Sequence, residues 1–119
     1  KDLIKTAGGK FVAPQKLENL FVTDPYISQA FLVGDRRPYC VALIVPNFQR
    51  LAEYARAQGL PDAPPQALVQ SPAIRGLLWN RVSALHQPLA SFEKVKAIAL
   101  LAEHGPRVPR QLRTHGGSN

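Results

Sequence analysis

Two adjacent glycines, Gly8 and Gly9, stand between Lys5 and Lys10 near the start of the sequence. A Gly-Gly pair between short strand-like segments predicts a tight turn with at least one residue at positive φ. The backbone N–H groups of such a turn, together with neighbouring ammonium groups, can bind a phosphate. The same residues also suit an ordinary hairpin turn with solvent-exposed lysines, and their spacing leaves both interpretations open.

The remaining reactive side chains do not form a recognisable catalytic pattern. Cys40 is the only cysteine and lies in an apolar, strand-like run, which is typical of a small core residue. The histidines are scattered along the chain, so the sequence predicts neither a catalytic triad nor a zinc site; they are His86, His104 and His115. Glycine-rich motifs of the P-loop and dinucleotide-binding types are also absent from the sequence. We therefore predict no metal site and no self-sufficient enzyme.

The 119 residues suit one domain, and the net charge of +7 is concentrated near the two ends of the chain. Four lysines and one aspartate fall within residues 1–16, and three arginines without an acidic residue fall within 104–119. A nucleic-acid-binding module usually carries its basic residues along one face or helix. We therefore expect no nucleic-acid partner. The alternative is a stand-alone interaction module that binds an acidic partner or nucleic acid through its basic ends.

The sequence contains no apolar run long enough to span a membrane and no recognisable signal or transit peptide. These features predict a cytoplasmic protein, with any membrane association made through a part of the parent outside this sequence. The chain begins with Lys1 and contains no methionine, which indicates a piece of a longer protein.

Hydrophobic periodicity and turn residues predict an alternation of short strands and helices. Strands are expected at 2–6, 10–12, 27–33, 39–45 and 95–101, and helices at 14–23, 48–58, 66–69 and 72–87. The strands at 27–33 and 39–45 are expected to form a hairpin, with the second strand buried on both faces. We predict one α+β domain over residues 1–103, with helices packed against a small three- to five-stranded sheet, and a flexible basic tail over 104–119.

Three segments resemble a known family: KDLIKTAGGKFVAP at the start, DPYISQAFLVGDRRPYCVALIVPN after it, and SFEKVKAIALL near the end. They are similar to the small C-terminal domain of AMP-forming acyl-CoA synthetases in the adenylate-forming ligase superfamily, and in particular to long-chain fatty acid CoA ligases. The resemblance covers residues 1–102 and is most specific in the first fifty.

The resemblance implies a parent enzyme that converts a fatty acid, ATP and CoA into acyl-CoA, AMP and diphosphate, with Mg. It implies that an N-terminal adenylation domain of the same parent binds most of these molecules, and that this domain is a lid that rotates about a hinge at Lys1 and Asp2. Rotation would exclude water from the acyl adenylate before the thiol enters. Gly8 and Gly9 would then lie against the CoA thiol arm, and Lys10 would face its nucleotide portion.

Two further residues of the family pattern can be placed. Glu18 matches the glutamate that ends the opening motif, and we expect it to be structural. The family also carries a lysine near its C-terminus that contacts the acyl carboxylate and the α-phosphate, but no lysine follows Lys96 here. Arg107 or Arg110 would bring charge, although a guanidinium does not reproduce the geometry of an ammonium group. We therefore assign no catalytic residue to this chain and expect it to be inactive in isolation.

Overall fold

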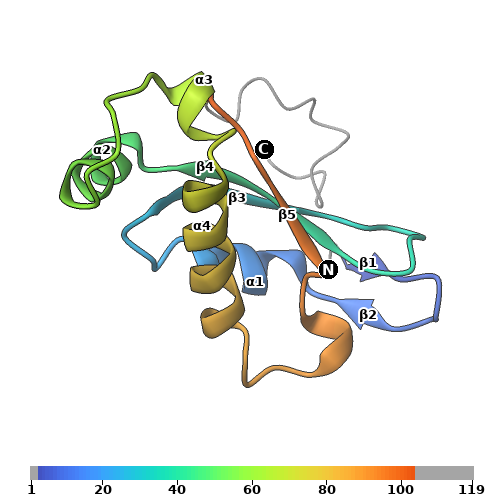
Figure 1. The fold of residues 1–119 in the computed structure, drawn as a ribbon. Coiled ribbons are helices and arrows are strands. Elements are labelled where there is room, and N and C mark those ends of the chain that lie inside the picture. Colours follow the sequence, from blue (N-terminus) through green and yellow to red (C-terminus); the bar gives the residue numbers. More distant parts are fainter. Residues whose placement is uncertain (1–2, 104–119) are drawn as a thin grey trace.

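The computed structural model describes residues 3–103, in which the strands form two separate small sheets (Figure 1). Strand β1 (Ile4–Lys5) pairs antiparallel with β2 (Phe11–Val12). The second sheet has the order β3-β4-β5, formed by β3 (Ile27–Val33), β4 (Val41–Pro46) and β5 (Ala97–Leu100). Strands β3 and β4 are the predicted antiparallel hairpin, and β5 lies parallel to β4. The α+β class is confirmed, with the strands divided between two sheets.

The four α-helices of residues 3–103 begin within one residue of their predicted starts, and one short 3₁₀-helix that the sequence does not predict follows them. They are α1 (Pro14–Phe21), α2 (Phe48–Ala57), α3 (Pro65–Leu68), α4 (Pro72–Leu85) and the short 3₁₀-helix η1 (Ser91–Glu93). The side chain of Asn47 accepts a hydrogen bond from the N–H of Arg50 at 3.1 Å, and the Ser71 hydroxyl accepts one from Ile74 at 3.4 Å. Each bond satisfies a backbone donor that a helix start leaves unpaired.

Helices α1 and α4 lie across one face of the three-stranded sheet, while α2 and α3 lie at the end remote from the β1–β2 hairpin (Figure 1). The core forms between these helices and the sheet because each element turns its apolar side inward. Its fully buried side chains include Leu17, Phe21, Leu32, Ala42, Ile44, Ile74, Leu78 and Val82.

The other face of β4 is more open than the sequence suggests. Its residues alternate at first, so Ala42 and Ile44 are buried while Val41 and Leu43 are only half-buried. Val41 and Leu43 line an open hollow of about 550 Å³ on this face. The expectation that the strand is buried on both faces is therefore wrong for its first half, because no helix among residues 3–103 covers these two side chains.

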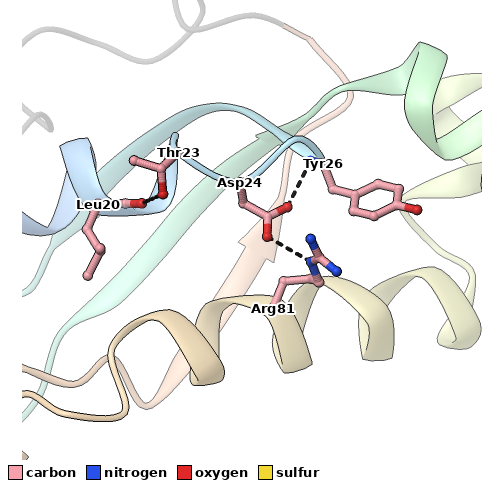
Figure 2. A network of polar contacts seen from close by, with 5 residues as sticks. All are labelled: Leu20, Thr23, Asp24, Tyr26 and Arg81. Carbon is pink, nitrogen blue, oxygen red and sulfur yellow. Dashed lines mark hydrogen bonds and ion pairs between the residues drawn. The ribbon is translucent and has the colours of Figure 1, made fainter.

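A polar network fastens the turn after α1 to helix α4 (Figure 2). The carboxylate of Asp24 is buried; its Oδ1 accepts the N–H of Tyr26 at 2.8 Å and its Oδ2 accepts the Nε–H of Arg81 at 2.7 Å. The Arg81 guanidinium also lies over the Tyr26 ring, 5.0 Å from the centroid. Helix α1 ends at Phe21, two residues before the predicted end at Thr23, because the Asp24 side chain supports a turn there instead.

The imidazole of His86 is buried at the C-terminal end of α4, with 4% of the residue exposed. It packs edge-on against Phe21, with 5.8 Å between the ring centroids. Neither ring nitrogen has a hydrogen-bond partner within the described part of the chain. A charged imidazolium in this position would be poorly solvated, so the folded chain favours the neutral ring.

Burial lowers the pKa of His86, and it is the largest of several influences. The backbone at Ser83 and Val95 offsets part of the effect by favouring the charged ring, whereas the positive charges of Lys94 and Lys96 lower the pKa further. The net direction is downward, so the proton binds more readily to this histidine in the unfolded chain than in the folded one.

We predict that the free energy of unfolding falls as the pH drops below about 6.5, the ordinary pKa of histidine, and continues to fall until the folded-state ring is protonated. The substitution His86→Phe removes this contribution and keeps a ring against Phe21. The variant should therefore lose less stability than the wild type between about pH 7 and about pH 5. Urea unfolding followed by circular dichroism at several pH values measures both curves, and parallel curves would contradict the prediction.

Candidate functional site

The hairpin of β1 and β2 carries the turn that the sequence singles out. The N–H of Thr6 donates to the carbonyl oxygen of Lys10 at 2.9 Å, and the N–H of Gly9 donates to that of Thr6 at 2.9 Å. The Thr6 hydroxyl adds two bonds, one to the Lys10 carbonyl and one from the Lys10 N–H. Gly9 has φ +86°, which confirms the predicted positive φ. A Cβ built on Gly8 or Gly9 would meet no atom within 4 Å, so the turn faces open space.

The loop between β3 and β4 is attached to this hairpin. The N–H of Arg36 donates to the carbonyl of Lys5, and the N–H of Ala7 donates to the carbonyl of Arg37, both at 2.8 Å. The N–H of Lys5 also donates to the Asp35 carboxylate at 3.2 Å. Because these bonds join residues about thirty positions apart, the hydrophobic pattern of either segment alone does not reveal them. The loop holds the Gly-Gly turn in place relative to the main sheet.

Most N–H groups of the turn are already used within the protein. Those of Ala7, Gly9 and Lys10 donate to backbone or hydroxyl oxygens, and only that of Gly8 lacks a partner within residues 3–103. The turn therefore does not offer several N–H groups to a phosphate at once. The positive charge beside it comes from the exposed side chains of Lys5 and Lys10, so an anion here would be bound by ammonium groups.

A hollow of about 340 Å³ opens beside the turn, and we call it the basic hollow. Its walls come from three separate segments and include Lys10, Tyr39, Ser91, Phe92, Lys94 and Lys96. The N–H of Lys96 donates to the carbonyl of Cys40 at 3.0 Å, which extends the pairing of β5 with β4 and fixes this lysine beside the hollow. The Lys10 ammonium lies 5.7 Å from the centre of the Phe92 ring, within range of a cation–π interaction.

The basic hollow keeps its positive charge because Glu93, the acidic residue within the segment that carries Lys94 and Lys96, is engaged elsewhere. Glu93 accepts from the Lys16 ammonium at 3.1 Å through Oε2 and from the N–H of Ala90 at 3.3 Å through Oε1. None of the three lysines of the hollow forms an ion pair within residues 3–103. Sequence reasoning identified Lys10 but missed Lys94 and Lys96, since only the parallel pairing of β5 brings them to the hairpin.

The other candidate residues either do not line the basic hollow or lie outside the described residues. The hinge residues Lys1 and Asp2, like the tail over 104–119, lie outside the described residues. Cys40 is fully buried and burial raises the pKa of its thiol, which confirms it as a core residue. The Glu18 carboxylate accepts the N–H of Leu32 at 2.8 Å and so joins α1 to β3, which confirms its structural role.

Two classes of feature are absent from the described part of the chain. Residues 3–103 bring together no group of three or more histidine, cysteine, aspartate or glutamate side chains that is placed to hold a metal ion. Over the same residues, no helix has both the length and the apolar character required to cross a bilayer.

These features define a small α+β domain with an exposed glycine turn at one end, and comparison with known proteins gives its family. The model of the AMP-binding enzyme C-terminal domain matches residues 1–111. The chain is 30% identical over 105 residues to long-chain-fatty-acid–CoA ligase 1 of Cavia porcellus, covering 87% of this chain and 15% of that protein. It is 32% identical over 102 residues to a putative fatty-acid–CoA ligase of Mycobacterium tuberculosis, covering 85% and 18%. The chain belongs to the AMP-binding enzyme C-terminal domain family.

Solved structures show the same fold. The adenylation domain of a carboxylate reductase from Mycobacterium chelonae superposes with a TM-score of 0.67 at 24% identity, over 87% of this chain and 15% of that one. The A-PCP didomain of a carboxylic acid reductase from Segniliparus rugosus, in complex with AMP, gives 0.65 at 24% identity, over 88% and 13%. The chain thus spans less than a fifth of the length of these relatives.

Proposed function

We propose that this chain is the rotating C-terminal lid of an AMP-forming long-chain fatty acid CoA ligase. In this proposal an N-terminal adenylation domain of the same parent activates the fatty acid with ATP. The lid then turns about Lys1 and Asp2 and supports attack of the CoA thiol on the acyl adenylate. The lid alone is inactive, and the parent is cytoplasmic, with any membrane association residing in its other part.

The exposed turn at Gly8 and Gly9 carries the proposal. It is held from two sides, by the Thr6 hydrogen bonds and by the β3–β4 loop, yet a side chain added at Gly8 or Gly9 would meet no atom of residues 3–103 within 4 Å. A fixed backbone without side chains is suited to close approach by a slender ligand such as the thiol arm of CoA. The family membership and the fatty-acid–CoA ligases among the relatives supply the chemical context.

Among the molecules that the proposed reaction requires, the residues of this chain are suited to CoA. The lysines around the hairpin suit the phosphates of CoA, because ammonium groups form strong charge-assisted hydrogen bonds with them. Residues 3–103 offer no cluster of carboxylates for Mg. We therefore place Mg and most of the ATP site in the N-terminal domain, and assign to this chain the positioning of CoA and the exclusion of water.

The substitution Gly8→Val should slow thioester formation while leaving adenylate formation nearly unchanged. The added side chain meets no atom within 4 Å in this domain, so folding should be preserved. In the complex it would occupy the space of the thiol arm, and misplacing a reacting group in this way should cost roughly tenfold in rate or more. The test uses the longer parent protein, with pyrophosphate exchange for the first step and single-turnover reaction of preformed acyl adenylate with CoA for the second.

Gly76→Val is the matched control, because Gly76 lies in α4 and a Cβ there also meets nothing within 4 Å. This variant should leave both half-reactions unchanged. Equal slowing of the thioester step by both variants would reject the role of the turn. Undiminished thioester formation by Gly8→Val would reject it as well.

A further inference from the structure

We propose that the open face of β4 carries a binding site for a free long-chain fatty acid, with the acyl chain on the sheet and the carboxylate on Arg37. The site is the hollow of about 550 Å³ on the side of the sheet opposite helices α1 and α4, and we call it the apolar hollow (Figure 1). Its walls include Val33, Arg37, Pro38, Tyr39, Val41 and Leu43. The site is additional to the place where the adenylation domain would activate its substrate, and the proposal does not depend on the proposed function.

The apolar character of this face follows from the strand register. Val33 lies opposite Val41 in the antiparallel pairing, and Leu43 lies two positions further along β4, so the three side chains share one face. On the neighbouring strand, Ala97 pairs with Val41 and Ala99 pairs with Leu43. These two short, exposed side chains do not cover β4. Methylene groups that lie on this face would leave water, which favours binding of an alkyl chain.

Arg37 is the charged residue among the walls of the apolar hollow. Its backbone is fixed by two hydrogen bonds of 2.8 Å, because its N–H donates to the carbonyl of Gly34 and its carbonyl accepts the N–H of Ala7. Its exposed side chain forms no ion pair within residues 3–103, and the carboxylate of Asp35 in the same loop accepts the N–H of Lys5. A guanidinium in this situation can bind a carboxylate through two parallel hydrogen bonds.

The balance of polar and apolar groups favours a fatty acid over other small ligands. Among the residues that line the apolar hollow, only Arg37 and the phenol of Tyr39 offer a polar side-chain group. A sugar or a nucleotide would place several polar groups against apolar walls, and each group left unpaired would weaken binding. A fatty acid has one polar end, which Arg37 can satisfy. The volume of about 550 Å³ also lies within the range of small-ligand sites, roughly 300 to 1,000 Å³.

The test titrates the 119-residue chain with decanoate, dodecanoate and tetradecanoate, each below its micelle concentration, by isothermal titration calorimetry. One molecule should bind per chain. Two added methylene groups should lower Kd roughly fourfold, about half the free-energy gain of full burial, because the hollow is open on one side. Amide chemical shifts should change at residues 33–43. Absence of saturable binding, equal Kd values for the three acids, or shift changes elsewhere would overturn the proposal.

Arg37→Gln should raise the Kd of dodecanoate about tenfold, since it removes hydrogen bonds to a charged group, and should leave the Kd of uncharged decanol unchanged. Arg36→Gln is the matched control, because Arg36 is the neighbour in the same loop, the change in net charge is the same, and Arg36 does not line the apolar hollow. The control should bind both ligands as the wild type does. An equal loss in Arg36→Gln, or weaker decanol binding by Arg37→Gln, would overturn the assignment of the carboxylate to Arg37.

Val41→Thr tests the position of the acyl chain. Threonine suits a strand and resembles valine in shape, but its hydroxyl would face the methylene groups, so Kd for dodecanoate should rise several-fold. Val22→Thr makes the same exchange at an exposed residue beyond the end of α1 and should leave Kd unchanged. Thermal unfolding of both variants verifies that they fold. A Val41→Thr variant that binds dodecanoate as tightly as the wild type would overturn the proposal.

Two further measurements separate the fatty acid from larger occupants of the same face. Vesicles of phosphatidylglycerol that capture the chain, without binding of monomeric dodecanoate, would overturn the proposal in favour of a lipid surface. Sedimentation equilibrium should give a monomer with and without dodecanoate. A dimer that Val41→Thr weakens and that dodecanoate leaves intact would overturn the proposal in favour of an interface between two copies of the chain.

Discussion

Alanine in place of Gly34 is expected to lower the free energy of unfolding by about 3 kcal/mol or more. Gly34 has φ +155°, and a Cβ there would lie 2.9 Å from the Cα of Cys40 and 3.0 Å from the carbonyl oxygen of Tyr39. Both contacts are with backbone atoms, which cannot rotate away as a side chain can. The backbone at the start of the β3–β4 loop must therefore shift, and the hairpin attached to that loop shifts with it.

Gly76→Ala is the control for this prediction and should have the opposite sign. A Cβ on Gly76 meets no atom within 4 Å, and alanine is favoured over glycine inside a helix by up to about 1 kcal/mol. Chemical unfolding of the two variants beside the wild type measures both effects. A Gly34→Ala variant as stable as the wild type would show that the close approach of the loop to Cys40 is not a constraint on the fold.

The second large effect is expected for Phe21→Ala, which should cost about 3–5 kcal/mol of stability. Phe21 is fully buried at the end of α1, where it packs within the core and against the imidazole of His86. Truncation leaves a cavity between α1 and α4 that rigid neighbours cannot fill. It also removes the ring against which the His86 imidazole packs.

Phe11→Ala serves as the matched control, because Phe11 lies on β2 with 56% of its surface exposed. Its replacement should change stability by no more than about 0.5 kcal/mol. Thermal unfolding of both variants compares the loss of a buried phenylalanine ring with the loss of an exposed one, because the substitution is the same in each case. Similar losses in the two variants would contradict the burial of Phe21 between the helices.

Local features of this domain follow directly from the sequence. Pro14, Asn47 and Ser71 stand at helix starts because each suits the first-turn geometry or satisfies an unpaired N–H there. Gly9 takes the positive φ that a Gly-Gly turn requires, and the β3–β4 hairpin follows from two β-branched runs joined by turn residues. These outcomes depend on interactions between residues that are close together in the sequence, so they can be predicted from the residue types and their order.

The tertiary structure alone decides the composition of the basic hollow. Lys10 and Lys96 are separated by more than eighty residues, and they meet because β5 pairs in parallel with β4 while the β3–β4 loop docks on the hairpin. The same long-range packing leaves Val41 and Leu43 on an open face, and it leaves the His86 imidazole without a hydrogen-bond partner among residues 3–103. Such contacts depend on how whole faces fit together, and residue periodicity records which side of an element is apolar but not which element will cover it.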